Sequence, residues 1–473
     1  MTKRSSSEAA DPPSTSRDGE ALATPLRGVV IMPMAWRGGM LKVASQLCNL
    51  LARHTYQGRS IQMCLAGNQH TARAHFDLDA GVSFVNVALE PVFSADPRLS
   101  RYLDPAVYPF TPTEPNRFVS PNSANVALFS ADFWISLTGF YNEGPLAPFK
   151  PYAVFAPDFI QRYVPEILPD DINNYGWYRE ACQIMTMQAA KVVFATTPKT
   201  VSDVTAYAGV PRDRVLLFPL FNSHEGGRLK KSGVDQTPKI ASAPATSEAA
   251  DADSMDHQWK LDRLRKYRYA FSPDFIKSPY FVWVTNTTEH KNHLRAIEML
   301  ASYYERHDGA LNCLIVGPST DKWADSDSEF AYIRDVADGI AGLASRTNKV
   351  HLLGELPSSL YADVLSGAQF LWHNVLYDNG TFTVLEAAEL GVPSLSSDYP
   401  QIRYICDLYG VRADFFDAHD VAEGARALKQ MQERQKAGPS DPGFQDLKPD
   451  LREAFDSLLD RILAPSAFQP VKA

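Results

Sequence analysis

The segment that decides the fold is Asp378-Asn379-Gly380-Thr381-Phe382-Thr383-Val384-Leu385-Glu386, which continues as Ala387-Ala388-Glu389-Leu390-Gly391-Val392-Pro393. An apolar run at 370–372 precedes it and another short apolar stretch follows it, so the pattern predicts strand, loop, helix and strand. Gly380 marks the expected start of the helix and Gly391 its end. Backbone N–H groups at such a start attract anions, and an acidic side chain about one turn inside accepts hydrogen bonds from ribose hydroxyls. The segment therefore predicts a site for a sugar nucleotide.

Apolar runs alternate with helical patterns along most of the chain. A first series starts with a strand at 29–33, a Gly38-Gly39 turn and a helix at 40–53, and a second series starts with a strand at 280–284. The other expected strands are 61–65, 83–87, 152–155, 192–195 and 215–218 in the first series, and 313–316, 350–353, 370–372 and 394–395 in the second. This alternation predicts an α/β protein with two parallel, doubly wound sheets. The stretch 96–125, rich in Pro, Ser and Asn, fits neither period and is expected to be an extended insertion.

Length and composition favour a globular protein of two domains. The chain has 473 residues, 45% of them hydrophobic, which is more than one core usually serves. Its net charge of −9 argues against nonspecific attraction to nucleic acid. Residues 1–23 lack the apolar stretch of a signal peptide, and no run reaches the roughly 18 apolar residues of a membrane helix. The five cysteines are expected to be reduced core residues of a cytosolic protein: Cys48, Cys64, Cys182, Cys313 and Cys406.

The acidic pair resembles a known signature. Asp378 and Glu386, with the Asn-Gly-Thr loop between them and the Glu-Ala-Ala helix after it, are similar to the acidic-x7-acidic motif of retaining glycosyltransferases of family 4, also called glycosyltransferase group 1. The resemblance implies a GT-B fold, in which two facing Rossmann-like, doubly wound domains enclose a cleft. It also implies that Asp378 holds the hydroxyls of the donor sugar and Glu386 the nucleotide ribose. The family usually has Glu first, so Asp378 is one methylene shorter; alternatively, Glu386 is an ordinary solvated helix residue.

A lysine follows the first strand of the second series. Lys291 lies between an expected strand and an expected helix, where an ammonium group can neutralise the charge that grows on a leaving diphosphate. The segment resembles the family's Arg-plus-Lys phosphate clamp, with Lys291 at the Lys position. Asn286 or Thr285 stands in place of the Arg and brings no charge, so this half of the clamp is weakened or comes from elsewhere, with Arg295 and Arg403 as candidates. The alternative is that Lys291 is a surface lysine.

Two loops of the first series carry further candidates. Glycine at Gly38 and Gly39 lets the backbone approach a ligand closely before a helix start, although a tight structural turn explains the pair equally well. In the family this loop lines the cleft near the donor phosphate. Pro157-Asp158 resembles the family's His-Asp loop, with Pro157 in place of the His that orients the donor sugar. Asp158 is a candidate general base toward an acceptor hydroxyl or a turn and N-cap residue.

The resemblance also divides the chain into parts. The expected order is a disordered tail at 1–26, an acceptor domain at 27–223, a linker with a low-complexity segment at 224–278, a nucleotide-sugar-binding domain at 279–450, and a C-terminal helix and tail at 451–473. Apolar residues recur at helical spacing in the last part, at Leu451, Phe455, Leu458, Leu459 and Ile462. In the family such a helix crosses back to the first domain.

The resemblance implies a metal-independent, retaining hexosyltransferase. Its catalytic residues are expected to be Asp158, Lys291 and Asp378, without metal ligands or a cofactor. Its donor-binding residues are expected to be Gly38, Gly39, Asn286, Lys291, Asp378, Asn379, Gly380, Thr381 and Glu386. By resemblance the donor is a nucleotide-diphosphate sugar, with GDP-mannose preferred, and the acceptor is a glycan or lipid-linked glycan of a surface polysaccharide such as lipopolysaccharide. The expected location is the cytoplasm, with peripheral contact at the inner face of the membrane.

Other classes of function have less support. The motifs GxxxxGK[ST], HExxH and GxSxG are absent, which disfavours a P-loop hydrolase, a zincin and an α/β-hydrolase. A nucleotide-sugar epimerase or a phosphorylase on the same architecture is one alternative. A noncatalytic nucleotide-sugar-binding or scaffold protein is the other, because Pro157, Asn286 and Asp378 depart from the family pattern.

Overall fold

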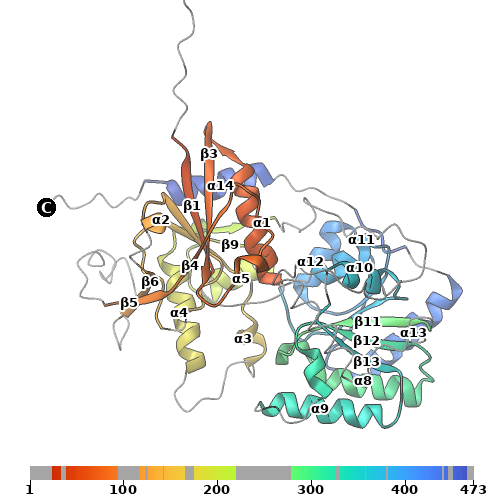
Figure 1. The fold of residues 1–473 in the computed structure, drawn as a ribbon. Helices are drawn as coiled ribbons and strands as arrows, with labels where there is room; N and C mark the ends of the chain where they lie inside the picture. Colours follow the sequence, from red (N-terminus) through yellow and green to blue (C-terminus); the bar gives the residue numbers. More distant parts are fainter. Residues whose placement is uncertain are drawn as a thin grey trace, which may run out of the picture.

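The protein folds into two α/β domains, each built on its own sheet (Figure 1). The computed structural model describes residues 24–32, 39–93, 117–122, 126–141, 143–165, 175–219, 278–324, 328, 330–356, 358–379, 382–438, 441–445 and 451–465. The expected tail at 1–26 and the expected linker at 224–278 lie almost wholly outside the described residues.

The first domain contains an eight-stranded sheet. Its strands are β1 (Leu26–Ile31), β2 (Thr55–Tyr56), β3 (Arg59–Asn68), β4 (Ser83–Val87), β7 (Phe133–Ser136), β8 (Tyr152–Phe155), β9 (Val192–Ala195) and β10 (Val215–Leu217). The order is β10-β9-β8-β7-β1-β3-β2, with β4 also paired to β3. Every pairing is parallel except β2 with β3. This confirms the predicted doubly wound sheet.

Helices cover both faces of the first sheet. They are α1 (Gly39–Arg53), α2 (Val126–Phe129), α3 (Ile160–Tyr163), α4 (Tyr175–Ala189) and α5 (Pro198–Ala206), with short 3-10 turns η1 (Arg73–His75) and η4 (Arg212–Arg214). Along β1, Leu26 and Val30 pack with α1, whereas Val29 and Ile31 pack in a second cluster with residues of α4 and α5. Because successive side chains alternate between faces, apolar residues on both faces give the continuous run seen in the sequence.

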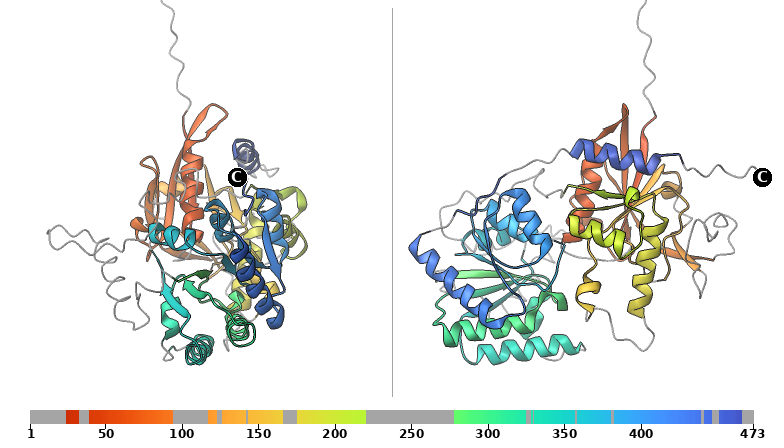
Figure 2. Two further views of the ribbon diagram at one scale, coloured as in Figure 1. Left: turned by 90° about the vertical axis from the view of Figure 1, so that its right-hand side faces the viewer. Right: turned by 180° about the vertical axis from the view of Figure 1, so that it is seen from behind.

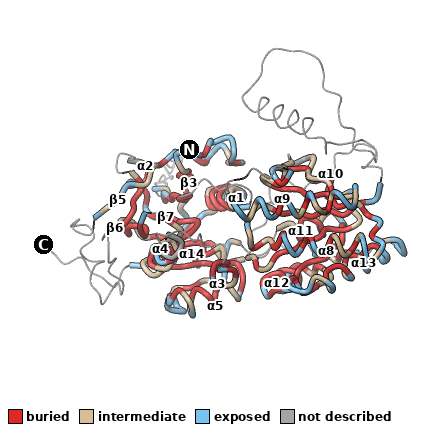
Figure 3. Tube along the Cα trace, turned by 90° about the horizontal axis from the view of Figure 1, so that it is seen from below, coloured by how far each residue is buried: buried red, intermediate tan, exposed pale blue. Residues whose placement is uncertain are grey.

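The second domain contains six parallel strands. They are β11 (Tyr280–Val284), β12 (Asn312–Val316), β13 (Val350–Gly354), β14 (Leu371–His373), β15 (Ser394–Ser397) and β16 (Ala413–Phe416), in the order β13-β12-β11-β14-β15-β16. Helices α10 (Ser358–Ser366), α11 (Phe382–Glu389) and α12 (Pro400–Tyr409) cover one face, and α8 (His293–Arg306), α9 (Ala331–Ala344) and α13 (Val421–Ala437) cover the other. Figure 3 shows the buried residues concentrated inside both domains.

A glycine allows two strand ends of the second sheet to approach closely. Gly317, directly after β12, has φ +145°, and a Cβ atom there would lie 1.7 Å from the Thr285 carbonyl oxygen after β11. Any other residue would push the two strand ends apart. The loop after β11, which carries Lys291, thereby begins close to the end of β12.

The last helix returns to the first domain. Helix α14 (Leu451–Leu463) follows the second domain in sequence, yet its apolar face lies in the hydrophobic cluster of β1 and α1 (Figure 2). At its polar edge, His54 Nε2 lies 2.9 Å from the Asp456 carboxylate, and the Tyr56 hydroxyl donates to Asp460 at 2.6 Å. The C-terminal end of the chain therefore completes the core of the N-terminal domain.

Five described strands differ from the sequence-based expectation. Within the stretch expected to be an irregular insertion, Arg117–Pro121 forms strand β6, which pairs antiparallel with β5 (Leu89–Phe93). The remainder of that stretch up to residue 116 lies outside the described residues. Strands β2, β5, β7 and β16 were not predicted either. The buried apolar run of β7 is as long as those of β8 and β9, which were predicted, so its length does not explain the omission.

We predict that Leu458→Ala will destabilise the first domain, because Leu458 is fully buried in the cluster shared by α14 and α1. A leucine-to-alanine change in such a core lowers the free energy of unfolding by about 2–5 kcal/mol. Chemical denaturation of the full chain measures this loss. The control is Ser457→Ala on the same helix, whose side chain is only partly buried. Equal stability of the two variants would contradict the packing of α14 in the core.

Candidate functional site

Two loops meet at the carboxyl edge of the second sheet. One follows β11 and contains the 3-10 turn η6 (Glu289–Lys291), and the other follows β14 and leads to α11. The Leu376 N–H donates to the His290 carbonyl at 2.7 Å, and the Asn374 amide donates to the Asn292 carbonyl at 3.2 Å. Asn292 takes the left-handed conformation, with φ 58°, which turns the chain from η6 into α8. These bonds fix η6 against the loop after β14.

Lys291 and Asp378 form an ion pair between these two loops. Their side chains are only 12% and 16% exposed, so water and salt screen the pair weakly. The Asn379 N–H also donates to the Asp378 carboxylate at 2.8 Å. Burial alone would raise the pKa of Asp378, but the Lys291 ammonium outweighs it and holds this pKa at about 2. Asp378 is therefore ionised near neutral pH and can accept hydrogen bonds only.

Asp158 reaches the same place from the first domain. It lies in the loop after β8, and its carboxyl group accepts a hydrogen bond from the Ile160 N–H at 3.3 Å. Burial and the nearby charge of Asp378 raise the pKa of Asp158 to about 7. A carboxyl group with this pKa is well matched to proton transfer near neutral pH. Pro157 beside it has no hydrogen-bonding side chain, so it does not replace a histidine.

Glu386 is a buried carboxylate with partners from both domains. It lies on α11 and is 4% exposed. The Lys42 ammonium, on α1 of the first domain, lies 3.0 Å from one of its oxygens, and the Tyr361 hydroxyl, on α10, donates to the other at 2.8 Å. The interpretation of Glu386 as a solvated helix residue is therefore wrong.

The second domain also matches a known family. Residues 272–438 fit the model described as "Glycosyl transferases group 1", a stretch that contains Lys291, Asp378 and Glu386. The second domain is similar to group 1 glycosyl transferases over these residues, and we call it the group 1 domain.

Solved structures of glycosyltransferases share the fold of the whole chain. WaaG, a glycosyltransferase involved in lipopolysaccharide biosynthesis, has a TM-score of 0.54 at 13% identity, over 93% of this chain and 100% of its own. HepE from Anabaena, in complex with UDP-glucose, has a TM-score of 0.52 at 12% identity, over 93% of this chain and 95% of its own. Sucrose-phosphate synthase from Thermosynechococcus elongatus has a TM-score of 0.52 at 15% identity, over 93% of this chain and 96% of its own. The fold is therefore GT-B. No curated protein matches the chain in a sequence comparison.

Asn379 of the group 1 domain faces the first domain. Its amide oxygen accepts a hydrogen bond from the Thr200 hydroxyl at 2.9 Å, and its amide nitrogen donates to the Thr196 hydroxyl at 3.4 Å. Beside it, the ring of Tyr377 stacks on Tyr163 of the first domain, with ring centres 4.1 Å apart. The loop after β14 thus joins the two domains, and the amide predicted to bind the donor is engaged in this contact.

The residues at the position expected for the second cation of the phosphate clamp, Asn286 or Thr285, are uncharged. The Asn286 side-chain oxygen accepts a hydrogen bond from the Thr288 N–H at 3.1 Å, which closes a local turn. Thr285 is buried, and its hydroxyl lies 3.0 Å from His293 Nε2. Both side chains therefore stabilise the loop that carries Lys291.

The two arginines considered as substitutes have partners of their own. Arg295 is exposed and donates to the Asn292 side-chain oxygen at 3.3 Å. Arg403 forms a 2.8 Å ion pair with Asp398. Neither is bonded to Lys291, Asp378 or Glu386 in the part of the chain that the structure describes.

The glycine loops of the site lie mostly outside the described residues. This applies to Gly38 in the first domain and to Gly380 and Thr381 in the group 1 domain. Gly39 is described. It is the exposed first residue of α1, and among the described residues no atom outside its chain neighbours and its own helix backbone lies within 4 Å of where its Cβ would be. Packing against the described residues therefore does not require glycine at position 39.

Two residues of the site were missed by the sequence analysis. Lys42 has a weak signal, because it is a cation in the otherwise apolar-rich first turn of a helix that follows the double glycine. Tyr361 has none, because it lies on α10, whose sequence shows only ordinary helical spacing. Their contacts with Glu386 depend on how α1, α10 and α11 come together in space.

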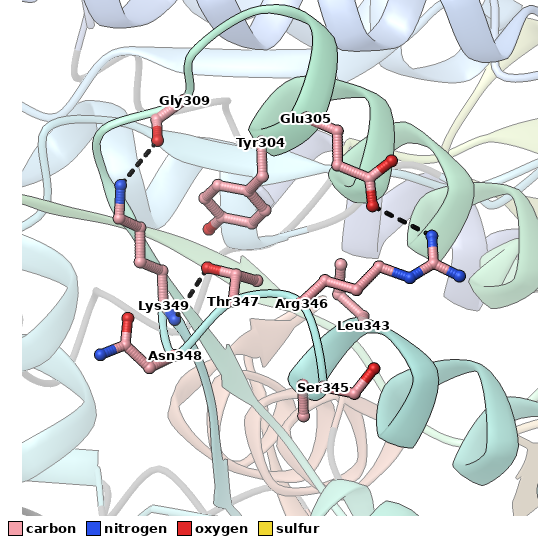
Figure 4. A pocket seen from close by; sticks show the side chains of 10 residues that line it. Tyr304, Glu305, Gly309, Leu343, Ser345, Arg346, Thr347, Asn348 and Lys349 are labelled. Carbon is pink, nitrogen blue, oxygen red and sulfur yellow. Dashed lines mark hydrogen bonds and ion pairs between the residues drawn. The ribbon is translucent and has the colours of Figure 1, made fainter.

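A hollow lies away from these residues (Figure 4). It has a volume of about 580 Å³ and lies at the amino edge of the second sheet, beside the end of α8 and the segment before β13. Its charged groups are already engaged: Arg346 pairs with Glu305 at 3.0 Å, and Lys349 donates to the Gly309 carbonyl at 2.8 Å. Ligands of parallel α/β sheets bind at the carboxyl edge, so the Lys291 region is the candidate site.

Among the described residues, no group of three or more His, Cys, Asp or Glu side chains is placed to hold a metal ion. None of the described helices is long and apolar enough to cross a membrane.

We predict that Asp158→Asn will change how stability depends on pH. The pKa of Asp158 is about 7 in the folded protein against 3.8 for a free side chain. Between these values the folded protein holds a proton that the unfolded chain has lost, so stability falls as pH rises through this window. Asparagine has no proton to release in this range, so the substitution removes this fall in stability. The melting temperature of Asp158→Asn relative to the unmodified protein should therefore increase from about pH 5 to about pH 8.

Scanning calorimetry at several pH values measures this difference. The control is Asp213→Asn, at an exposed position of the same domain, which should show no pH-dependent gain. Parallel melting curves for Asp158→Asn and the unmodified protein would show that Asp158 is not buried beside a like charge.

Proposed function

We propose that the protein is a retaining, metal-independent glycosyltransferase that takes a hexose from a nucleotide-diphosphate sugar. The observation that carries the proposal is the meeting of the Lys291–Asp378 ion pair with Glu386 at the carboxyl edge of the group 1 domain, opposite Asp158 of the first domain. Nucleotides bind at this edge in open α/β sheets. The family match supports glycosyl transfer as the reaction, since it covers Lys291, Asp378 and Glu386.

Each group has a role in this reaction. Glu386 accepts hydrogen bonds from the ribose hydroxyls, and Asp378 accepts them from the donor sugar. The bond between the anomeric carbon and the diphosphate oxygen breaks, and the diphosphate keeps the electron pair. Lys291 and the backbone N–H groups at the start of α11 stabilise the negative charge that develops there. The acceptor oxygen bonds to the anomeric carbon on the face that the diphosphate leaves, and its proton passes to Asp158 or to the departing phosphate.

The donor and acceptor follow from the resemblance and are part of the proposal. GDP-mannose is the preferred donor, and UDP-glucose is the alternative to test, since HepE has been solved in complex with it. The acceptor is a glycan or a lipid-linked glycan of a surface polysaccharide, in keeping with the similarity to WaaG, a glycosyltransferase involved in lipopolysaccharide biosynthesis. A lipid-linked acceptor places the protein in the cytoplasm at the inner face of the membrane. The five cysteines are free and buried, which agrees with a reducing compartment.

We predict that one nucleotide diphosphate and its sugar will stabilise the protein through Glu386. A ligand at a hundred times its dissociation constant adds roughly 2.7 kcal/mol to the free energy of unfolding. A thermal-shift screen of GDP, UDP, ADP and TDP and their hexoses measures this effect. Glu386→Ala should abolish it, because the ribose loses its acceptor. The matched control is Glu389→Ala, at a half-buried position one turn further along α11, which should keep the shift.

Hydrolysis of the donor without acceptor separates an enzyme from a binding protein. Slow release of hexose from the donor that gives the shift, lost in Glu386→Ala, supports the transferase. A shift without any release favours the noncatalytic alternative, and conversion of the sugar to its epimer favours the epimerase. The absence of a shift with every nucleotide would overturn the proposed site.

A further inference from the structure

An ion pair between the two domains occupies the carboxylate that the ribose needs. Lys42 Nζ lies 3.0 Å from Glu386 Oε1, and the two residues are 344 positions apart in the sequence. The Lys42 side chain is 47% exposed, whereas that of Glu386 is 5% exposed. The pair therefore has a buried acidic end in the group 1 domain and an accessible basic end in the first domain.

The ribose and Lys42 share one carboxylate. A carboxylate has about four acceptor positions on its two oxygens, and Lys42 and Tyr361 use one position on each oxygen. Burial and the charge of Glu386 raise the pKa of Tyr361, so this hydroxyl remains protonated and a donor. Lys42 is the accessible partner, with a flexible stem. Of the two partners, Lys42 is therefore the one that a bound nucleotide can displace.

A displaced Lys42 remains close to the phosphates. In a nucleotide the α-phosphate is joined to the ribose ring through the 5′ methylene group and its ester oxygen, so a cation on a long side chain that has left the ribose site has the diphosphate within reach. Among the described residues of the predicted phosphate clamp, Lys291 is the cation, and Asn286 brings no charge. The chemistry of the ligand and the position of Lys42 thus complement each other.

The location of Lys42 on its helix is otherwise unfavourable. Lys42 lies in the first turn of α1, which contains no acidic residue. A cation near a helix N-terminus is repelled by the helix dipole, so Lys42 gains from any nearby anion. Glu386 is that anion in this structure, and a diphosphate carries more negative charge than a single carboxylate.

We propose that Lys42 transfers from Glu386 to the diphosphate of the donor when the donor binds, and that it supplies from the first domain the second positive charge of the phosphate site. This inference rests on the proposed function. In this arrangement the phosphate site is complete only when the first domain lies against the group 1 domain. Lys42 then binds the diphosphate that leaves the sugar.

The test compares ligands with and without phosphates. Isothermal titration of the full chain with UDP and uridine, and with GDP and guanosine, gives four dissociation constants. Lys42→Met keeps the length of the side chain and removes its charge. It should weaken binding of the diphosphate about tenfold or more, since a hydrogen bond to a charged group is lost. Binding of the nucleoside should stay equal or improve, because Glu386 is released.

Arg53→Met is the matched control. Arg53 lies on the same helix and pairs with Asp79 of its own domain at 2.7 Å, with a side chain 52% exposed. It should bind both ligands as the unmodified protein does. Lys42→Arg should keep most of the diphosphate affinity, because the positive charge remains. Lys42→Gln, neutral and polar, takes the place of Lys42→Met if the latter does not fold.

The outcomes separate this inference from the proposed function. If the unmodified protein binds neither diphosphate, the proposed function fails and the role of Lys42 fails with it. If it binds one of them and Lys42→Met binds it equally well, only the role of Lys42 is overturned. Equal weakening of the diphosphate and the nucleoside also overturns it, because Lys42 would then act only by holding Glu386.

Discussion

The ion pair between Lys291 and Asp378 is the interaction on which the candidate site depends. Each partner comes from a different loop at the carboxyl edge of the second sheet, and both are largely buried. A buried carboxylate without its cation is strongly destabilising, and here Asp158 adds a second acid beside the first. The lysine therefore makes it possible for two acidic groups from opposite domains to share one small volume.

The charges at the interface form a consistent set. Asp378 is kept ionised by Lys291, while Asp158 takes up a proton near neutral pH. Glu386 is bonded to Lys42 across the interface. One carboxyl group thus accepts hydrogen bonds, one is suited to move a proton, and one exchanges its partner. Three residues of similar chemistry receive different roles from their surroundings alone.

The sequence predicted the elements of this site better than their contacts. The run from Asp378 to Pro393 predicted loop, helix and strand because turn residues and apolar spacing are local signals, and α11 and β15 lie where they were expected. Strand β7 was missed although its four buried residues form a run like those of β8 and β9, which were predicted. Lys42 and Tyr361 were missed because they contact Glu386 through the packing of three helices, and spacing along the chain contains no information about such packing.

The return of α14 to the first domain has a mechanical consequence. The chain passes between the domains twice, once between β10 and β11 and once between α13 and α14. A second covalent crossing restrains the separation of the domains more than a single crossing would. The packing of α14 against β1 and α1 therefore helps to keep Lys42 within reach of Glu386.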